Sequence, residues 1–327
     1  MEPSRALEAA LVELAWSHWT ALGVSGWRLG RGSRVDVNDA AIDPEPLILL
    51  TAALGEIDPR LRTEALDWCV SFGRYISKIR LNKVLELNIG ERKATWSFAA
   101  TVNKLTHLGW PSDDARAIRF EPTGRSELAV RGRASAIRVR ARLIFGVSAR
   151  AEILVLLGSE SSGTYSATDV AERVRYGRRN VVEALDALIA AGLVRQIDAA
   201  GARRYSLADP VAIHAILGPT PAHFIDWGVA FAACWRALTT LQRFSDSPPT
   251  IQAVEAAKSA EAIESLLMRT WLTPPRSSPS GPAAWQRFGD WALDLVQMFA
   301  DPSRAEFAPR RPRRRVRKMS LPRRAAG

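Results

Sequence analysis

The hydrophobic positions along the chain follow a helical spacing over most of its length. Residues 4–23 place apolar side chains at intervals of three and four and end at Gly23, which is typical of an amphipathic helix with a glycine stop. Two Asp-Pro pairs, at 43–44 and 58–59, mark further helix starts, since aspartate caps a helix and proline suits its first turn. The pattern therefore predicts a mainly α-helical protein.

One stretch of the chain departs from this pattern, because its helical segments are followed by alternating, strand-like residues. In order, it contains a helix that starts at 148 and ends at Gly158, a short strand over 163–167, a helix over 167–174, the turn "RYGRR" over 175–179, a helix that ends at Gly192, and two strands over 193–198 and 203–209. We assign the sharp reversal to Gly177, since glycine permits the backbone conformation that a tight turn needs. The stretch predicts three helices plus a β-hairpin within residues 137–209.

The turn and the residues before it are unusually basic, with Arg173 and Arg175 before Gly177 and Arg178 and Arg179 after it. Arginines in the first turn of a helix are mismatched to its positive dipole end, at a cost of up to about 1 kcal/mol per charge. Phosphate oxygens would satisfy both the arginines and the free amides of the helix start. The pattern therefore favours contact with DNA.

The order helix, turn, helix and hairpin resembles the winged helix-turn-helix transcription regulators of bacteria, broadly the multiple-antibiotic-resistance and arsenic-repressor groups. The resemblance covers residues 148–208 only. The residues that carry it are Ala171, Val174, Val181, Leu185, Leu188, Gly192, Leu193, Val194, the wing glycine Gly201 and Tyr205. It implies that the second helix of the motif enters the major groove while the wing lies along the DNA backbone.

By this resemblance, the first turn of that helix meets base edges, since arginine can read guanine and asparagine adenine. The groove candidates are Arg178, Arg179, Asn180 and Glu183. The remaining polar side chains of the turn and the wing are better placed for phosphates. These phosphate candidates are Arg175, Tyr176, Arg203 and Arg204. The metal ligands of arsenic repressors have no counterpart, because no cysteine lies in or near this stretch.

The segments on either side of this unit are expected to form two separate helical domains. Residues 1–125 form an N-terminal helical domain of unknown role, and residues 211–301 a C-terminal helical domain that could serve dimerisation. Within the latter, one helix face carries Phe224, Trp227, Phe231, Trp235 and Leu238, which is the candidate association surface of a homodimer.

A second helix-turn-helix is an open alternative for the glycine-containing turn "SFGRYIS" at 71–77. It would direct Arg74, Lys78, Arg80 and Lys83 outward. Any pair of antiparallel helices joined by a glycine turn has the same pattern, so both interpretations stand.

The net charge of +11 belongs mostly to the C-terminus. Residues 310–327 hold nine Lys or Arg and no acid, which leaves +2 for the rest of the chain. We expect residues 302–327 to be a disordered, Arg-rich tail that is attracted to polyanions. The N-terminus does not read as a signal peptide, no apolar run reaches membrane-span length, and the two cysteines are not paired by spacing, so we expect a reduced, cytoplasmic protein.

The sequence offers no recognisable catalytic or metal motif. The four histidines are never spaced i, i+4, and the glycines of residues 23–33 lack the Lys and Ser of a phosphate-binding loop. We expect no cofactor, no metal and no enzymatic activity, and double-stranded DNA as the partner of a sequence-specific transcriptional regulator. The alternative is a protein-interaction or antitoxin-like subunit, whose winged helix contacts protein while its basic tail binds nucleic acid nonspecifically. An enzyme acting on nucleic acid ranks last.

Overall fold

The structure is a computed structural model, which describes residues 2–25, 40–160, 163–199, 202–218, 224–268, 270, 273–275 and 283–301. Most of this part of the chain is α-helical, and its strands form one antiparallel hairpin, so the expected mainly-α class is confirmed. The expected basic tail at 302–327, the wing glycine Gly201 and most of the glycine-rich segment 23–33 lie outside the described residues.

The elements follow one another in a simple order along the chain. They are α1 (Pro3–Leu22), α2 (Pro44–Ala53), η2 (Leu54–Glu56), α3 (Pro59–Phe72), η3 (Gly73–Tyr75), α4 (Lys78–Leu85), α5 (Arg92–Thr106), η4 (Ala134–Ala136), α6 (Ile137–Phe145), α7 (Ala149–Ser159), α8 (Ala167–Val174), α9 (Arg178–Ala190), β1 (Val194–Ala199), β2 (Ala202–Leu207), α10 (Pro210–Leu217), α11 (Trp227–Arg243), α12 (Pro249–Met268) and α13 (Ala284–Ala300).

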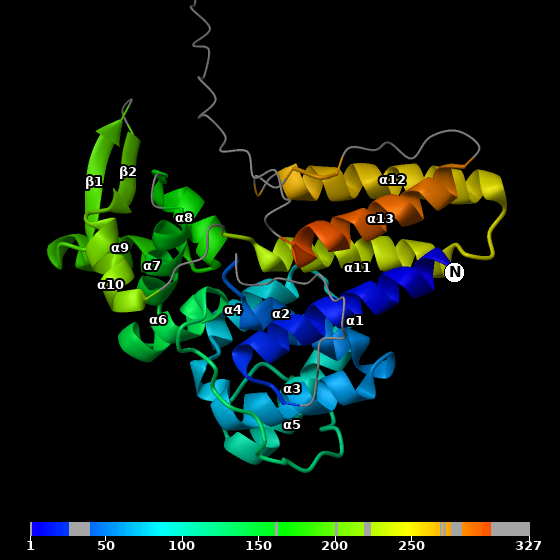
Figure 1. Cartoon of the computed structure of the whole chain (residues 1–327), viewed down its shortest axis with the longest axis horizontal. Helices are drawn as coiled ribbons and strands as arrows, with labels where there is room; N and C mark the ends of the chain where they lie inside the picture. Colours follow the sequence, from blue (N-terminus) through cyan, green and yellow to red (C-terminus); the bar gives the residue numbers. More distant parts are fainter. Residues whose placement is uncertain are drawn as a thin grey trace, which may run out of the picture.

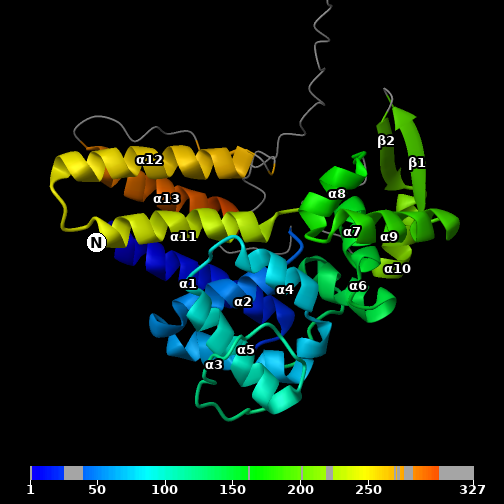
Figure 2. The same cartoon turned by 180° about the vertical axis from the view of Figure 1, so that it is seen from behind.

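Helices from both ends of the chain share one hydrophobic core. Helices α1 to α5 pack with α11, α12 and α13 around large aromatic side chains, and α1, α11 and α13 run alongside one another in Figures 1 and 2. The fully buried tryptophans of this core are Trp16, Trp19, Trp68, Trp227 and Trp291. The segments that we expected as two flanking domains are therefore one unit, here called the helical body, because the apolar faces of α1 and α2 are covered by those of α11 and α13.

Most of the aromatic stripe lies inside this core, although Trp235 is only partly buried against it and Phe224, which precedes α11, is buried elsewhere. Trp227, Phe231 and Leu238 are each fully buried, and the indole nitrogen of Trp227 donates to the carbonyl of Ala41 at 2.8 Å. The prediction that this stripe is an association surface is wrong, because the chain covers it with its own α1 and α13. It gives no support to a homodimer.

Residues 137–217 form a second unit with its own core, here called the central unit. Helix α7 lies in its middle, and α6, α8, α9, α10 and the hairpin pack around it. The hairpin pairs Val194 with Leu207 at its base, and Tyr165 adds a single antiparallel bridge to Tyr205. Helix α10 belongs here and not to the C-terminal helices, since its apolar residues Ile213 and Leu217 are buried in this core. In both views the hairpin projects away from the helical body (Figures 1 and 2).

Of the helix-boundary residues marked in the sequence, Gly23 and Asp58 act as expected and Asp43 does not. Gly23 ends α1 in a left-handed conformation, with φ of 105°, and the Asp58 carboxylate caps α3 by accepting from the Leu61 amide at 3.0 Å. Asp43 occupies the same capping position before α2, but its carboxylate makes no cap hydrogen bond. Instead, it binds the guanidinium of Arg80 through both oxygens, at 2.8 and 2.5 Å.

Asp43 is part of a group of charged side chains buried between the helical body and the central unit. We call this group the buried ion cluster, and its members are Asp43, Glu45, Arg80, Arg138, Arg142 and Glu152. Each of them is at most 5% exposed. With three arginines and three carboxylates, the cluster is electrically balanced, which is the condition under which buried charges are tolerated.

The cluster joins four segments that are distant in sequence. Arg142 of α6 donates to Glu45 of α2 at 2.8 and 2.9 Å and to Glu152 of α7 at 2.8 Å. Arg138 also donates to Glu152. Burial alone would raise the pKa of Asp43 and of Glu152, but the adjacent arginines hold both pKa values below their usual range. Asp43 and Glu152 are therefore ionised, whereas burial raises the pKa of Glu45 in spite of the adjacent Arg142 and Arg80. The cluster holds the central unit against the helical body.

Removal of one cluster arginine should destabilise the fold strongly. Arg142→Met removes one of the two arginines that Glu45 and Glu152 share, and we expect a loss of about 3–5 kcal/mol in the free energy of unfolding. The measurement is urea unfolding at pH 7, followed by tryptophan fluorescence.

Lys258→Met is the control for that variant, because it breaks the exposed i, i+3 pair between Lys258 and Glu255. Such exposed pairs contribute about 1 kcal/mol at most. Equal unfolding free energies for the two variants would contradict the structural role of the cluster.

His18 is the other buried ionisable group whose state has consequences for stability. Its ring lies edge-on to Trp227, with ring centres 4.3 Å apart, and neither ring nitrogen has a hydrogen-bond partner among the described residues. Burial lowers the pKa of His18 from 6.5 to about 3. The imidazole is therefore neutral in the folded protein and would be protonated after unfolding at mildly acid pH.

Acidification should destabilise the protein through His18. The unfolded chain binds a proton below pH 6.5 and the folded chain does not until about pH 3. The contribution of the neutral His18 to the free energy of unfolding is therefore fully present above pH 6.5 and is lost as the pH falls below that value. The loss amounts to about 2 kcal/mol between pH 7 and pH 5. Urea unfolding of the wild type and of His18→Phe at both pH values measures this, and the variant should lose about 2 kcal/mol less. The exposed His107→Asn serves as control, and a wild-type pH dependence in His18→Phe would refute the assignment.

Candidate nucleic-acid interface

The first turn of α9 is open to solvent. Helix α8 begins with a capping box, in which the Ser166 hydroxyl accepts from the Asp169 amide at 3.1 Å and the Asp169 carboxylate accepts from the Ser166 amide at 2.9 Å. Helix α9 follows after three residues, the last of which, Gly177, is its N-cap, and no side chain of the described residues caps its free amides. The side chains of its first turn, Arg178, Arg179 and Asn180, are all exposed. An uncapped helix start with two cations is an anion-binding arrangement.

Glu183 lies one turn further along the exposed face of α9. Its carboxylate binds Arg179 at 3.0 Å, but the two side chains are 63% and 91% exposed. Exposed i, i+4 pairs of this kind are worth only a few tenths of a kcal/mol. Arg179 is therefore free to exchange Glu183 for a stronger anionic partner.

The hairpin places its two candidate arginines differently. Arg203 is exposed on β2, opposite Asp198 of β1. Arg204 is half-buried, and its guanidinium donates to the side chain and the carbonyl of Thr164, at 2.9 and 2.5 Å. Of the two, Arg203 presents its charge to solvent, while Arg204 braces β2 against the start of α8.

The turn between α8 and α9 directs its polar side chains toward the helical body. The Arg175 guanidinium binds the Asp226 carboxylate at 2.5 Å, and the Tyr176 hydroxyl lies 2.9 Å from the hydroxyl of Ser77. Tyr176 is 6% exposed, and burial raises the pKa of its hydroxyl. The expected phosphate contacts of Arg175 and Tyr176 do not fit this placement, because both side chains already have partners in the helical body.

The backbone reversal in this turn occurs at Arg175 and not at Gly177. Arg175 is left-handed, with φ of 58°, whereas Gly177 has an ordinary extended conformation, with φ of −60°. A Cβ atom at Gly177 would meet no other atom within 4 Å. The assignment of the turn to the glycine is therefore wrong, and an arginine occupies a conformation that is unfavourable for residues other than glycine.

The residues that hold the turn were not found from the sequence. Arg80, which a second helix-turn-helix would direct outward, is fully buried, and its Nε donates to the carbonyl of Val174 at 2.9 Å. That outward placement is wrong for Arg80, although Arg74, Lys78 and Lys83 are exposed. Ser77 and Asp226 were likewise missed, because their partners lie 99 and 51 residues away and no local pattern marks such pairs.

The described residues give no indication of a metal site or of an activated thiol. No group of three or more His, Cys, Asp or Glu within them is arranged to hold a metal ion. Cys69 and Cys234 are buried, and burial raises the pKa of both thiols, so neither is activated. His223, one of the four histidines of the sequence, lies outside the described residues. None of the described helices has the length and apolar character that crossing a membrane requires.

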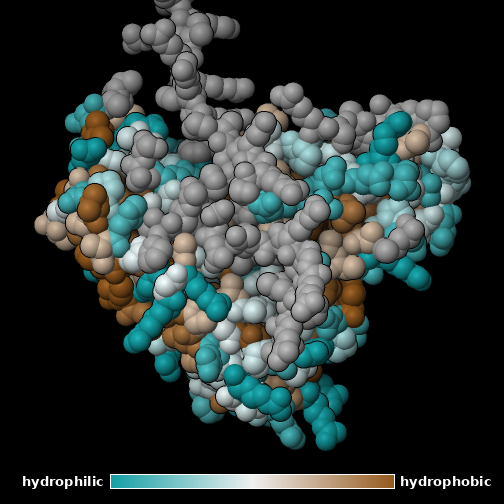
Figure 3. All heavy atoms as spheres, viewed as in Figure 1, coloured by the Kyte–Doolittle hydropathy of each residue, from teal (hydrophilic) through white to brown (hydrophobic). Residues whose placement is uncertain are grey.

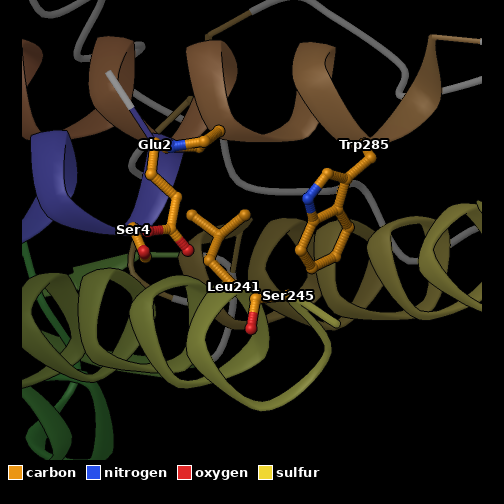
Figure 4. A pocket seen from close by; sticks show the side chains of 6 residues that line it. Glu2, Ser4, Leu241, Ser245 and Trp285 are labelled. Atoms are coloured by element: carbon orange, nitrogen blue, oxygen red, sulfur yellow. The ribbon is translucent and has the colours of Figure 1, made fainter. Parts of the chain in front are cut away.

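A small hollow lies where the start of α1 meets the end of α11 and the start of α13 (Figure 4). Its volume is about 70 Å³, well below the roughly 300 Å³ of ordinary ligand pockets. Its lining consists of Glu2, Pro3, Ser4, Leu241, Ser245 and Trp285. The hollow is suited to water molecules and not to a substrate.

Apolar side chains gather on the outer surface of the central unit, over the ends of α6 and α10 (Figure 3). They are between 37% and 77% exposed, and they comprise Leu143, Ile144, Val147, Val211 and Ile216. Its composition is that of a surface which could contact another protein.

No protein-family model matches the chain, and neither a curated protein nor a solved structure is detectably similar to it. Its function must therefore be argued from the geometry of its own residues.

Proposed function

We propose that this protein is a sequence-specific DNA-binding transcriptional regulator, with a winged helix-turn-helix formed by α7, α8, α9 and the β1–β2 hairpin. The observation that carries the proposal is the open first turn of α9. Its amides have no cap among the described side chains, and Arg178, Arg179 and Asn180 are exposed beside them. A phosphate or a base edge can satisfy these groups together, which water and Glu183 do only weakly.

The roles of the exposed side chains follow from their positions. Arg178 and Arg179 are suited to guanine and Asn180 to adenine, because the start of α9 would lie deepest in the major groove. In the complex with DNA, the Glu183 carboxylate leaves Arg179. Either Glu183 then contacts a base itself, or the released Arg179 does. Arg203, exposed on the hairpin, is suited to a phosphate beside the groove.

The alternative function is protein interaction, and the exposed apolar residues on α6 and α10 favour it. In that case, the Arg-rich segment 302–327 alone would account for binding to nucleic acid. Such binding would be strongly salt-dependent and indifferent to sequence. The two functions therefore differ in which residues bind nucleic acid, namely the first turn of α9 in a regulator and the segment 302–327 in an interaction protein.

DNA binding should separate into a sequence-reading part and a phosphate-binding part. The measurement is fluorescence anisotropy across a salt series, with a random duplex and with duplexes from the DNA upstream of the protein's own gene. We expect Arg178→Gln/Arg179→Gln to abolish the preference for one fragment, since each good base contact contributes about 1–3 kcal/mol of discrimination. Arg203→Gln should keep the preference and lower the slope of log affinity against log salt by about 0.9.

The control variant is Arg236→Gln/Arg243→Gln, which removes two exposed arginines of α11 and should keep the preference. Each variant is measured in the full chain and in a chain that ends at residue 301. If the shortened chain binds no DNA and the Arg178/Arg179 variant of the full chain behaves as wild type, binding resides in the tail, and the interaction function replaces the proposed one.

A further inference from the structure

We infer that Arg175 and Tyr176 are positioning residues, which tie the start of α9 to the helical body so that the body sets how α9 meets DNA. The part of this inference that concerns DNA rests on the proposed function. Through these contacts, the helical body would influence DNA recognition without itself touching the DNA. Three successive residues, Val174 at the end of α8 and then Arg175 and Tyr176 of the turn, are each bound by a different group of the body.

Val174, the last residue of α8, is bound first. Its carbonyl accepts from the Nε of Arg80 at 2.9 Å, and Arg80 is held in turn by Asp43 in the buried ion cluster. A guanidinium that is fully buried and bonded on several sides has little freedom to move. The end of α8 is therefore fixed to α4.

Arg175 is bound to the start of α11. Asp226 caps that helix with one oxygen, which accepts from the Val229 amide at 3.2 Å, and binds Arg175 with the other. The Asp226 side chain is only 9% exposed. The left-handed backbone of Arg175 persists because its surroundings hold it there, as strained residues require.

Tyr176 is bound to the start of α4. Its hydroxyl pairs with Ser77, which caps α4 by accepting from the Arg80 amide at 3.3 Å. The backbone amide of Ser77 donates to Glu45 at 2.7 Å. Tyr176 is thus linked to Glu45 of the buried ion cluster through Ser77, and the next residue, Gly177, is the N-cap of α9.

A direct phosphate contact by Arg175 is the competing interpretation, and the two predict opposite effects of Asp226→Asn. Asparagine caps a helix as well as aspartate does, so the change removes the charge and leaves α11 capped. If Arg175 positions α9, the loss of its partner weakens binding. If Arg175 contacts DNA, the loss of a competing carboxylate strengthens binding.

The test uses the full chain as wild type, Asp226→Asn and Tyr176→Phe, with two measurements, and Arg175→Gln is added for the salt slope. Without DNA, hydrogen exchange in the peptide spanning residues 170–185 should become faster in both variants, since each loses one tether. With DNA, the affinity for the preferred duplex relative to the random duplex should fall about tenfold in Asp226→Asn, which loses a charge-assisted hydrogen bond, and by less in Tyr176→Phe, which loses a neutral one. The salt slope should not change, because no phosphate contact is lost. Glu183→Gln, which breaks the exposed pair with Arg179, is the exchange control and should leave that peptide unchanged.

Three outcomes would overturn parts of this account separately. Unchanged exchange in both variants refutes the tether, whatever happens with DNA. Tighter binding by Asp226→Asn, together with a slope about 0.9 lower in Arg175→Gln, makes Arg175 a phosphate contact and refutes the positioning role. Faster exchange combined with no duplex preference in the wild type leaves the tether standing and refutes the proposed function.

Discussion

The burial of six charged side chains is the constraint on which the arrangement of this protein depends. Desolvation of an ion costs several kcal/mol, and oppositely charged partners are needed to offset that cost. Since the partners come from α2, α4, α6 and α7, the charges are paired only when the central unit is docked on the helical body. The cluster therefore acts against every other orientation of the two units, because each would leave unpaired charges in a low-dielectric interior.

This constraint extends from the cluster to the surface through α4. Arg80 and Ser77 belong to this helix or its cap, and they bind the turn that leads into α9, while Asp226 of the helical body binds the same turn from the start of α11. A continuous set of contacts thus connects the buried ion cluster to the turn before α9, the helix whose outer face is exposed. In the function that we propose, rigidity of this kind lowers the entropic cost of binding, because the side chains that meet DNA start from a fixed helix.

The sequence was sufficient where local interactions decide the structure. The glycine that ends α1 and the alternation that forms the hairpin both follow from neighbouring residues, and both predictions are confirmed. It was insufficient where a distant partner decides. Asp43 has the pattern of a helix cap but serves as a ligand of Arg80, and Trp227 has the pattern of an open stripe but is covered by α1 and α13. In the candidate interface, the exposure of Arg178 could be predicted from helical periodicity, whereas the inward direction of Tyr176 depends on Ser77, 99 residues away.

The central claim is that α9 faces DNA while the rest of the protein holds it in place. The most direct test is photo-crosslinking from position 186, on the exposed face of α9, with a photoreactive residue in place of Asp186 so that the arginines of the first turn are kept. A second protein carries the same residue at the exposed position 258 of α12. The account predicts a crosslink to the preferred duplex from position 186 and none from 258. Equal crosslinking from both positions, or none from 186, would contradict it.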